Sequence, residues 1–263
     1  MTRSLLPAYG LPSSKMRLLL VPFRTLATLL SGFLATLVFA PLAIVVGRAR
    51  RDSPWIDRFA RSWSRAWLAP AGCRLEVSGR ENVDTTKSYV VVANHLSNFD
   101  VMACFLAVPL SIRYLAKKEL FKVPLLAPAM RAVGIVEVDR DARSAIHTQV
   151  NTQSKAVLSL GRSLIIYPEG TRSRSGELQR FKKGAFTMAV SNQIPVLPVT
   201  IQGSWEAWRP DRPLIFGGPI RVVIDPPLPT EGLSNADAGA LMNEARAIIE
   251  KRIEELRAVA GRS

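Results

Sequence analysis

One segment of this 263-residue chain, from residue 25 to residue 46, carries no charged residue over 22 consecutive positions. At about 1.5 Å per helical residue, it is long enough to cross the roughly 30 Å hydrocarbon core of a bilayer. Three structures fit: a cleaved signal peptide, a membrane-spanning helix, or a helical hairpin in one leaflet that breaks at Gly32 and Pro41. A signal peptide fits least, because Pro41 would directly follow the cleavage site and the region before the apolar stretch is long. The segment therefore predicts a membrane-bound protein.

The chain is strongly basic, with 35 lysines and arginines against 21 acidic residues and a net charge of +14. Such an excess predicts an anionic partner. An anionic membrane accounts for both the charge and the apolar segment, whereas nucleic acid leaves that segment unexplained. Four arginines follow the segment closely, at positions 48, 50, 51 and 58, whereas three basic residues lie shortly before it, at positions 15, 17 and 24. The positive-inside rule then predicts the inner (cytoplasmic) membrane, with the rest of the chain on its cytoplasmic side.

The stretch after the apolar segment combines basic residues with Trp55, Trp63 and Trp67. Ile56 and Phe59 share a helical face with the last two tryptophans. This helix can lie in the lipid headgroup region, or it can face a protein core with a solvated basic side. We expect residues 1–70 to form a membrane anchor with this basic amphipathic helix, and residues 71–263 to form one further domain.

Apolar, β-branched runs alternate with helical patterns through that second domain. Strands are expected at 73–79, 89–93, 111–116, 135–138, 163–168 and 194–203, with two short strands in 214–227. Helices are expected at 99–108, 141–160, 186–193 and 234–258, and at 119–134 with interruptions at Pro124 and Pro128. The alternation predicts an α/β fold with a mainly parallel central sheet flanked by helices. Two cysteines without a paired spacing favour a reducing compartment.

His95, one of two histidines, directly follows the apolar run that ends in Ala93 and Asn94. In parallel sheets such strand ends carry the functional side chains. Asp100 has the spacing of a helix-capping carboxylate behind Ser97. It can also fold back onto His95, fix the imidazole tautomer and leave the other ring nitrogen as a base. The two interpretations can hold together. A metal site fits less well, because no third ligand has a matching spacing.

A second polar loop follows the strand at 163–168 and reads "YPEGTRS". It contains Glu169, Gly170, Thr171, Arg172 and Ser173. An arginine between two hydroxyls is suited to binding a phosphate group, and the glutamate can brace the turn. A solvated basic loop is the alternative.

Two more basic residues follow expected strands elsewhere, namely Lys118 and Arg140. Each by itself also fits a surface charge.

Four motifs occur in order along the chain: "NHLSNFD", "GIVEVDR", "YPEGTRS" and "IPVLPV". Together they resemble the four conserved blocks of the lysophosphatidic acid acyltransferase (1-acyl-sn-glycerol-3-phosphate O-acyltransferase) family, over roughly residues 70 to 230. The resemblance implies the sheet-and-helix fold of glycerol-phosphate acyltransferases, which makes residues 71–263 the acyltransferase domain. Two positions depart from the family pattern: Glu137 and Tyr167 stand where aromatic residues and Phe are usual.

The resemblance also implies roles for the residues. His95 would be the general base and Asp100 its orienting partner. The acceptor's phosphate would be bound by basic and polar side chains, with these assigned to substrate binding: Lys118, Arg140, Glu169, Gly170, Thr171, Arg172 and Ser173. Backbone N–H groups near the start of the helix at 98–108 are candidate donors to the oxyanion.

The expected reaction is acyl transfer from a thioester to the free hydroxyl of lysophosphatidic acid, which gives phosphatidic acid. Acyl-coenzyme A or acyl carrier protein would supply the acyl group, with no metal and no other cofactor. Another lyso-lipid acceptor, such as a lyso-ornithine lipid, is the alternative within the enzyme class. A non-catalytic protein that only binds anionic membranes would explain the charge, but not a histidine and an aspartate at a strand end.

Overall fold

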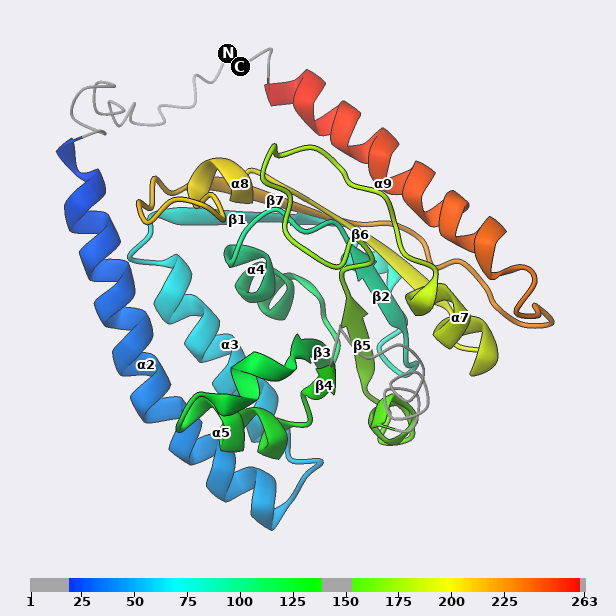
Figure 1. Ribbon diagram of the computed structural model, residues 1–263, viewed down its shortest axis with the longest axis horizontal. Coiled ribbons are helices and arrows are strands. Elements are labelled where there is room, and N and C mark those ends of the chain that lie inside the picture. Colours follow the sequence, from blue (N-terminus) through cyan, green and yellow to red (C-terminus); the bar gives the residue numbers. More distant parts are fainter. Residues whose placement is uncertain (1–18, 139–152, 261–263) are drawn as a thin grey trace, which may run out of the picture.

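The computed structural model describes residues 19–138 and 153–260. A seven-stranded sheet forms its centre, with the strand order β1-β7-β6-β2-β5-β3-β4 (Figure 1). The strands pair in parallel, except that β6 and β7 are antiparallel. Their bounds are β1 Cys73–Ser78, β2 Val90–Ala93, β3 Ile112–Lys117, β4 Val136–Val138, β5 Ser163–Ile166, β6 Val196–Gln202 and β7 Gly218–Ile224. The predicted α/β fold with a mainly parallel sheet is confirmed.

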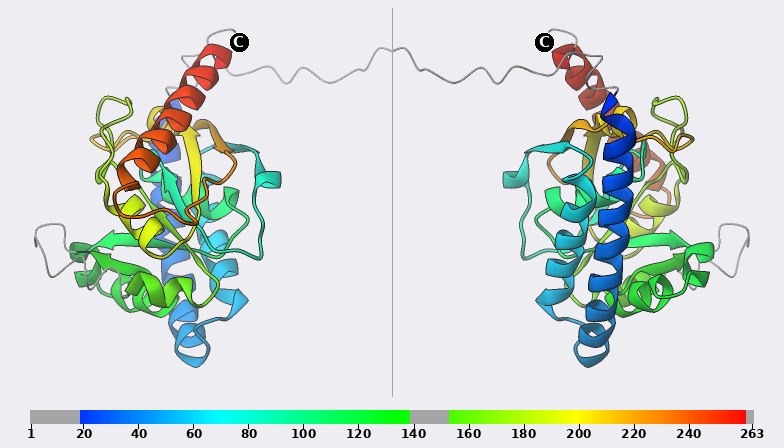
Figure 2. Two further views of the ribbon diagram at one scale, coloured as in Figure 1. Left: turned by 90° about the vertical axis from the view of Figure 1, so that its right-hand side faces the viewer. Right: turned by 90° about the vertical axis from the view of Figure 1, so that its left-hand side faces the viewer.

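Helices cover both faces of the sheet. They are α2 Val21–Ala49, α3 Pro54–Leu68, α4 Phe99–Ala107, α5 Leu126–Val133, α7 Gly184–Ser191, α8 Ser204–Ala207 and α9 Ala238–Ala260, with short 3-10 turns η1 Arg80–Asn82 and η2 Lys118–Lys122. On one side α4 lies next to the sheet, α3 packs on α4, and α2 packs on α3. On the other side lie α7 and α9. Figure 2 shows α9 in front of the sheet in one view and α2 in front in the other.

The strands divide the core into two layers, because successive side chains of a strand point to opposite faces. In β2, Val91 and Ala93 join the apolar cluster under α4. Val90 and Val92 join the cluster under α7 and α9. All four side chains are fully buried. This two-sided burial explains why β2 reads as a continuous apolar run rather than an alternating one.

Three expected elements differ in the structure. The helix expected at 119–134 is interrupted at Pro124 as predicted, which gives η2 and α5 with Leu125 at a φ of 64°, but Pro128 lies inside α5 without ending it. The two strands expected in 214–227 are one strand, β7, preceded by a tight turn at Gly217, where a Cβ would lie 2.0 Å from the backbone oxygen of Ala71. The short helix α8 was not expected. Of the helix expected at 141–160, only residues 153–160 lie within the described part, and 153–158 are helical.

The apolar segment forms one continuous helix, α2, which fits the alternative of a single helix and not that of a hairpin. Gly32 is needed for packing rather than for a break. A Cβ there would lie 2.1 Å from the indole ring of Trp67 on α3. Pro41 lies inside the helix without ending it. By length and composition α2 can cross a membrane. This agrees with a membrane-associated protein, while the division of the chain near residue 70 stays a prediction.

The helix after the apolar segment is α3, and of its two expected positions, in the lipid headgroup region or against the protein core, it mostly takes the second. Ile56 is buried, and Trp63 and Trp67 pack against the cluster under α4. Trp55 is the exception, because it is 52% exposed and carries the guanidinium of Arg58 at 4.6 Å from its ring. The basic side of α3 is thus solvated, and one tryptophan at its start remains available to a membrane surface.

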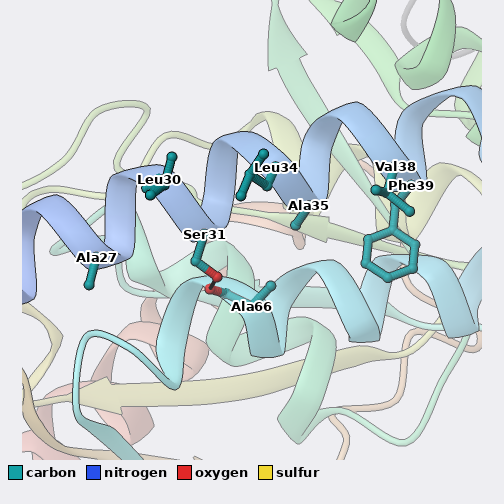
Figure 3. Close-up of a pocket in the computed structure, with 8 residues that line it drawn as sticks. All are labelled: Ala27, Leu30, Ser31, Leu34, Ala35, Val38, Phe39 and Ala66. Atoms are coloured by element: carbon teal, nitrogen blue, oxygen red, sulfur yellow. Dashed lines mark hydrogen bonds between the residues drawn. The ribbon is translucent and has the colours of Figure 1, made fainter.

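Helices α2 and α3 leave a shallow apolar groove of about 550 Å³ between them. Figure 3 shows Ala27, Ser31 and Ala35 on the side of α2 that faces α3, where the Ser31 hydroxyl donates to the carbonyl of Ala66 at 2.7 Å. Small side chains at these positions let the two helices approach closely. The outer side of α2 remains apolar and uncovered, with its exposed residues including Phe23, Leu26, Leu30, Phe33, Val38 and Val45.

Candidate active site

The candidate site lies beyond the carboxyl ends of β2 and β5, which are neighbours in the sheet. His95 follows β2, and the loop from Tyr167 to Ser173 follows β5. The backbone N–H of Ser173 donates to the carbonyl of His95 at 2.8 Å. The parallel pairing therefore brings together two motifs that are more than seventy positions apart in the chain.

His95 and Asp100 are in contact, as their spacing predicts. The Nδ1 atom of His95 lies 2.8 Å from Oδ2 of Asp100. The imidazole is 15% exposed, whereas the carboxylate is fully buried. A carboxylate at Nδ1 favours the tautomer with the proton on that nitrogen, which leaves Nε2 as the nitrogen that can accept a proton.

The same carboxylate also organises the start of α4. Asp100 Oδ2 accepts backbone N–H groups from Leu96 at 2.6 Å and from Ser97 at 2.7 Å. The expected capping box is thus half formed. The Asp100 carboxylate accepts the N–H of Ser97, but the Ser97 hydroxyl accepts the N–H of Phe99 instead of the N–H of Asp100. Orientation of His95 and capping of the helix share one oxygen atom, so the local chain fold holds the carboxylate in place before any substrate arrives.

Glu169 ties the two loops together. Its Oε1 accepts the backbone N–H of His95 at 2.6 Å, and its Oε2 accepts the N–H of Gln179 at 2.9 Å. The side chain is 4% exposed. Burial raises the pKa of this carboxyl to about 7, against the two N–H groups, which lower it. Glu169 acts here as a brace, the role that the sequence allowed beside substrate binding.

Tyr167 packs face to face on the imidazole of His95. The ring centroids are 3.9 Å apart and the planes differ by 9°. The tyrosine hydroxyl lies 4.0 Å from the sulfur of Cys104, a fully buried residue of α4. Such a buried environment is unfavourable for a charged group. Burial raises the pKa of Cys104 to about 12 and that of Tyr167 well above its usual range. Tyr167 therefore stays neutral and fixes the plane of the imidazole.

Arg172 lies next to the His95 loop. Its Nη1 atom donates to Oδ1 of Asn98, the residue before α4, at 2.5 Å. Thr171 is exposed, Ser173 is buried, and Gly170 has a φ of 79° with the Lys182 ammonium close above it. The loop thus presents a half-exposed guanidinium at the start of α4 and an exposed hydroxyl next to it in the chain, which is an arrangement suited to an anionic group.

The other expected site residues are placed as follows. Lys118 begins η2 at the carboxyl end of β3, along the same edge of the sheet. Arg140 lies outside the described residues. Two asparagines were not assigned any role from the sequence. The Asn94 amide bonds to the backbone of Ile201 on β6 in both directions, and Asn98 holds Arg172. Both are part of "NHLSNFD", and their positions directly after β2 and directly before α4 are the signal that could have found them.

Comparison with known proteins identifies the class. Residues 74–202 match the Acyltransferase family. The crystal structure of the 1-acyl-sn-glycerophosphate (LPA) acyltransferase PlsC from Thermotoga maritima superposes with a TM-score of 0.78 at 25% identity. The match covers 92% of this chain and 98% of that one.

Curated relatives define the family more narrowly. The human 1-acyl-sn-glycerol-3-phosphate acyltransferase beta is 30% identical over 197 residues, which cover 75% of this chain and 69% of that protein. The human alpha enzyme is 30% identical over 175 residues, and the chloroplastic LPAT1 of Arabidopsis thaliana is 31% identical over 198 residues. This chain belongs to the 1-acyl-sn-glycerol-3-phosphate acyltransferase family. The match to the human alpha enzyme covers 66% of this chain and 62% of that protein. The match to the Arabidopsis protein covers 74% of this chain and 53% of that protein.

Proposed function

We propose that this protein transfers an acyl chain from an acyl thioester to the free hydroxyl of lysophosphatidic acid, which gives phosphatidic acid. The relatives named above are acyltransferases of this acceptor. The observation that carries the proposal is the contact of His95 Nδ1 with Asp100 Oδ2, on a loop whose backbone Glu169 holds. Such a pair supplies a base at Nε2 and needs no metal or other cofactor.

His95 acts as the general base in this proposal. Its Nε2 takes the proton of the acceptor hydroxyl while the hydroxyl oxygen forms a bond to the thioester carbonyl carbon. The tetrahedral intermediate then collapses, the C–S bond breaks, and the sulfur leaves with the proton from the imidazolium. Asp100 stabilises the imidazolium between these two proton transfers. No covalent acyl-enzyme is required.

The donors to the developing oxyanion can be narrowed from the hydrogen bonds of the loop. The N–H groups of Leu96 and Ser97 are bonded to Asp100, that of Phe99 to Ser97, and that of Asp100 to the carbonyl of Ser97. The N–H of Asn98 has no acceptor among the residues that the structure describes. Asn98 is therefore the backbone donor of this turn that we assign to the oxyanion.

Arg172 is assigned to the acceptor's phosphate. Its guanidinium is half-buried and positioned by Asn98, so a phosphate would meet a planar donor whose orientation is already set. Thr171 adds an exposed hydroxyl, and Lys118 and Arg140 remain predicted contributors from the neighbouring strands.

The proposal places the protein on the cytoplasmic side of the inner membrane through α2. The outer side of α2 carries large apolar side chains, such as Phe33 at 59% exposure. Burial in lipid stabilises such a side chain by about 1.5–3 kcal/mol. Phe33→Asp should therefore weaken flotation with anionic vesicles, whereas Leu160→Asp, at an exposed position directly before Gly161 and near the start of β5, should not. Removing residues 1–46 is a less clean test, because α3 would lose the helix that covers it.

The direct test uses the purified full chain in neutral detergent with one acyl thioester and a panel of lyso-lipids, and it reads the release of free thiol. We expect lysophosphatidic acid to give the largest kcat/KM. Faster reaction with lyso-ornithine lipid would move the assignment to that acceptor. Absence of thiol release with every acceptor, for both acyl-coenzyme A and acyl carrier protein donors, would contradict acyl transfer.

A further inference from the structure

Two buried arginines lie at the end of the sheet opposite His95. Arg113 is the second residue of β3, and Arg162 directly precedes β5. They are 2% and 5% exposed. Both strands run parallel to β2, so these residues lie at the amino ends of the strands, whereas the candidate active site lies beyond the carboxyl ends. The two sites are separated by the length of the strands.

The two guanidinium groups are close to each other, and one carboxylate accompanies them. A Cβ built on Gly134 would lie 3.2 Å from Nη1 of Arg162 and 3.8 Å from Nε of Arg113, so both atoms lie within 4 Å of one point. Nη1 of Arg113 donates to Oδ1 of Asp57 on α3 and to the carbonyl oxygen of Ile112, each at 2.7 Å. Asp52 is the next acidic group, but it is exposed and bonded to Arg50.

Several donors of this pair have no acceptor. Nε and Nη2 of Arg113 are buried and have no hydrogen-bond partner among the residues that the structure describes. No hydrogen bond joins the Arg162 guanidinium to any of those residues either. Burial, and after it the charge of Arg113, lower the pKa of Arg162 to about 10, so it remains charged at neutral pH. The carboxyl end of α5 carries a partial negative charge of about half an elementary charge. Exposed Arg131, in the last turn of α5, interacts with the same partial charge.

A buried charge without a counter-charge is strongly unfavourable, and charged groups in protein interiors are normally paired. Two guanidinium groups with free donors favour an oxyanion, because their planar donor sets match phosphate oxygens. The neighbouring α2–α3 turn has exposed Arg48, Arg50 and Arg51 and the exposed Trp55, which would guide a phosphate from a lipid headgroup or from solution. From this geometry we propose a phosphate-binding site formed by Arg113 and Arg162, separate from the active site.

The test compares thermal unfolding of the purified full chain in neutral detergent, with inorganic phosphate against chloride at equal ionic strength. Wild-type protein should gain in melting temperature with phosphate, because a ligand that binds only the folded state stabilises it. Arg162→Gln should weaken the apparent phosphate affinity by about tenfold or more, the effect of losing a charge-assisted hydrogen bond. Asp57→Asn should strengthen the response, because it removes the carboxylate that competes for Arg113.

Two matched variants separate this site from other cations. Arg58→Gln removes an exposed guanidinium of the same region, and Arg172→Gln removes the one assigned to the acceptor. Arg58→Gln should keep the phosphate response. Arg172→Gln should lose only the part of the response that comes from the active site, and the loss in Arg162→Gln should add to it. If Arg162→Gln does not fold, Arg162→Lys, which keeps a charge but loses the planar donor set, should retain part of the response.

The source of the phosphate is distinguished by detergent micelles that contain either phosphatidic acid or phosphatidylcholine. Stabilisation by inorganic phosphate, lost in Arg162→Gln, identifies a small-anion site. Stabilisation by phosphatidic acid alone, with the same loss, identifies a headgroup site. No stabilisation by either, or an equal response in Arg162→Gln, overturns the proposal. None of these outcomes depends on acyl transfer, so the proposed function can fail independently.

Discussion

At the carboxyl ends of β2 and β5, buried carboxylates are bonded by backbone N–H groups, whereas at the amino ends of β3 and β5 two buried guanidinium groups share one carboxylate. Asp100 and Glu169 each accept two N–H groups from residues of the loops around them. Arg113 has one charged partner, Asp57, and a bond to the carbonyl of Ile112, and two of its nitrogens have no partner among the described residues.

The difference shows what each end is built for. A carboxylate that the backbone already bonds does not need to reorganise during a reaction, and such preorganisation is what a proton-transfer site requires. A guanidinium with free donors is incomplete until an acceptor arrives, and that is what a binding site requires. Asp100 Oδ1 also lacks a partner among the described residues, so the two ends differ in the backbone N–H donors that hold Asp100 Oδ2 and Glu169, not in complete satisfaction of every buried atom.

The largest expected effect tests the carboxyl end. His95→Ala should lower kcat by about 10²–10⁴-fold, the usual loss with a general base. Asp100→Asn should also be severely impaired, because the tautomer of His95 is no longer set. Thiol release by purified variants measures both.

The control for these variants is the fold itself. His95→Ala should keep its far-ultraviolet circular dichroism and its flotation with vesicles, because within the described residues the imidazole bonds only to the side chain of Asp100 and to no backbone group. Near-normal turnover of folded His95→Ala would show that the chemistry lies elsewhere.

Arg172 tests whether the carboxyl end also binds charge. Arg172→Ala should raise KM for the lyso-lipid about 10- to 150-fold, as expected for a charge-assisted hydrogen bond worth about 1.5–3 kcal/mol. Arg172→Lys should restore only part of it. KM for the acyl donor should change much less, and it is measured by varying each substrate separately.

A nonspecific surface charge would behave differently in that experiment. It would produce small losses that are similar for both substrates and that disappear at moderate salt. Equal effects on donor and acceptor would contradict the assignment of Arg172 to the headgroup.

The pH dependence of stability tests whether the buried carboxyl of Glu169 is protonated in the folded protein. Its pKa of about 7 in the folded protein lies above the value of about 4.3 for an exposed glutamate. The folded state therefore binds this proton more tightly than the unfolded state. The contribution to stability is complete below about pH 4 and is lost as the pH rises through about 7, by about 3–4 kcal/mol in total.

Denaturant unfolding between pH 5 and pH 8 measures this contribution. Wild-type protein should lose stability with rising pH relative to Glu169→Gln, whose side chain does not titrate. The variant should itself be less stable at pH 5 by about 1–3 kcal/mol, because one buried N–H loses its acceptor. Parallel pH profiles for the two proteins would mean that Glu169 is ionised throughout this range.

The sequence predicts local features of this molecule well and distant pairings poorly. The strand at 90–93 and the contact of His95 with Asp100 follow from a short apolar run and a five-residue spacing. In contrast, Arg113 and Asp57 are 56 positions apart, and nothing near either residue indicates the other. The antiparallel direction of β7 is equally hidden, because a strand's direction depends on the path of the chain between strands.

Side-chain roles show the same limit. The sequence identifies the loop that contains Glu169, but both of its hydrogen bonds reach backbone groups that only the fold brings near. Gly32 offers a possible helix break in only one of the three alternatives for its segment, and a glycine in an apolar run carries no sign of the tryptophan that packs on it. What a buried residue contacts depends on packing between elements, which local sequence patterns do not encode.

The smallest expected effect concerns the ring that packs on His95. Tyr167→Phe keeps the aromatic stack at 3.9 Å and removes only a hydroxyl whose contact with the Cys104 sulfur is 4.0 Å long. Such a weak contact contributes little, so we expect turnover within about twofold of wild type and a change in stability below about 1 kcal/mol. Tyr167→Leu removes the stack, worth about 0.5–1.5 kcal/mol, and should lower kcat by roughly 2- to 10-fold while the acceptor KM changes less. The order of the two variants is the test, because a larger loss for Phe than for Leu would assign the role to the hydroxyl instead of the ring. The imidazole would then be held by a buried polar contact, and the carboxyl end would resemble the amino end more closely than the structure indicates.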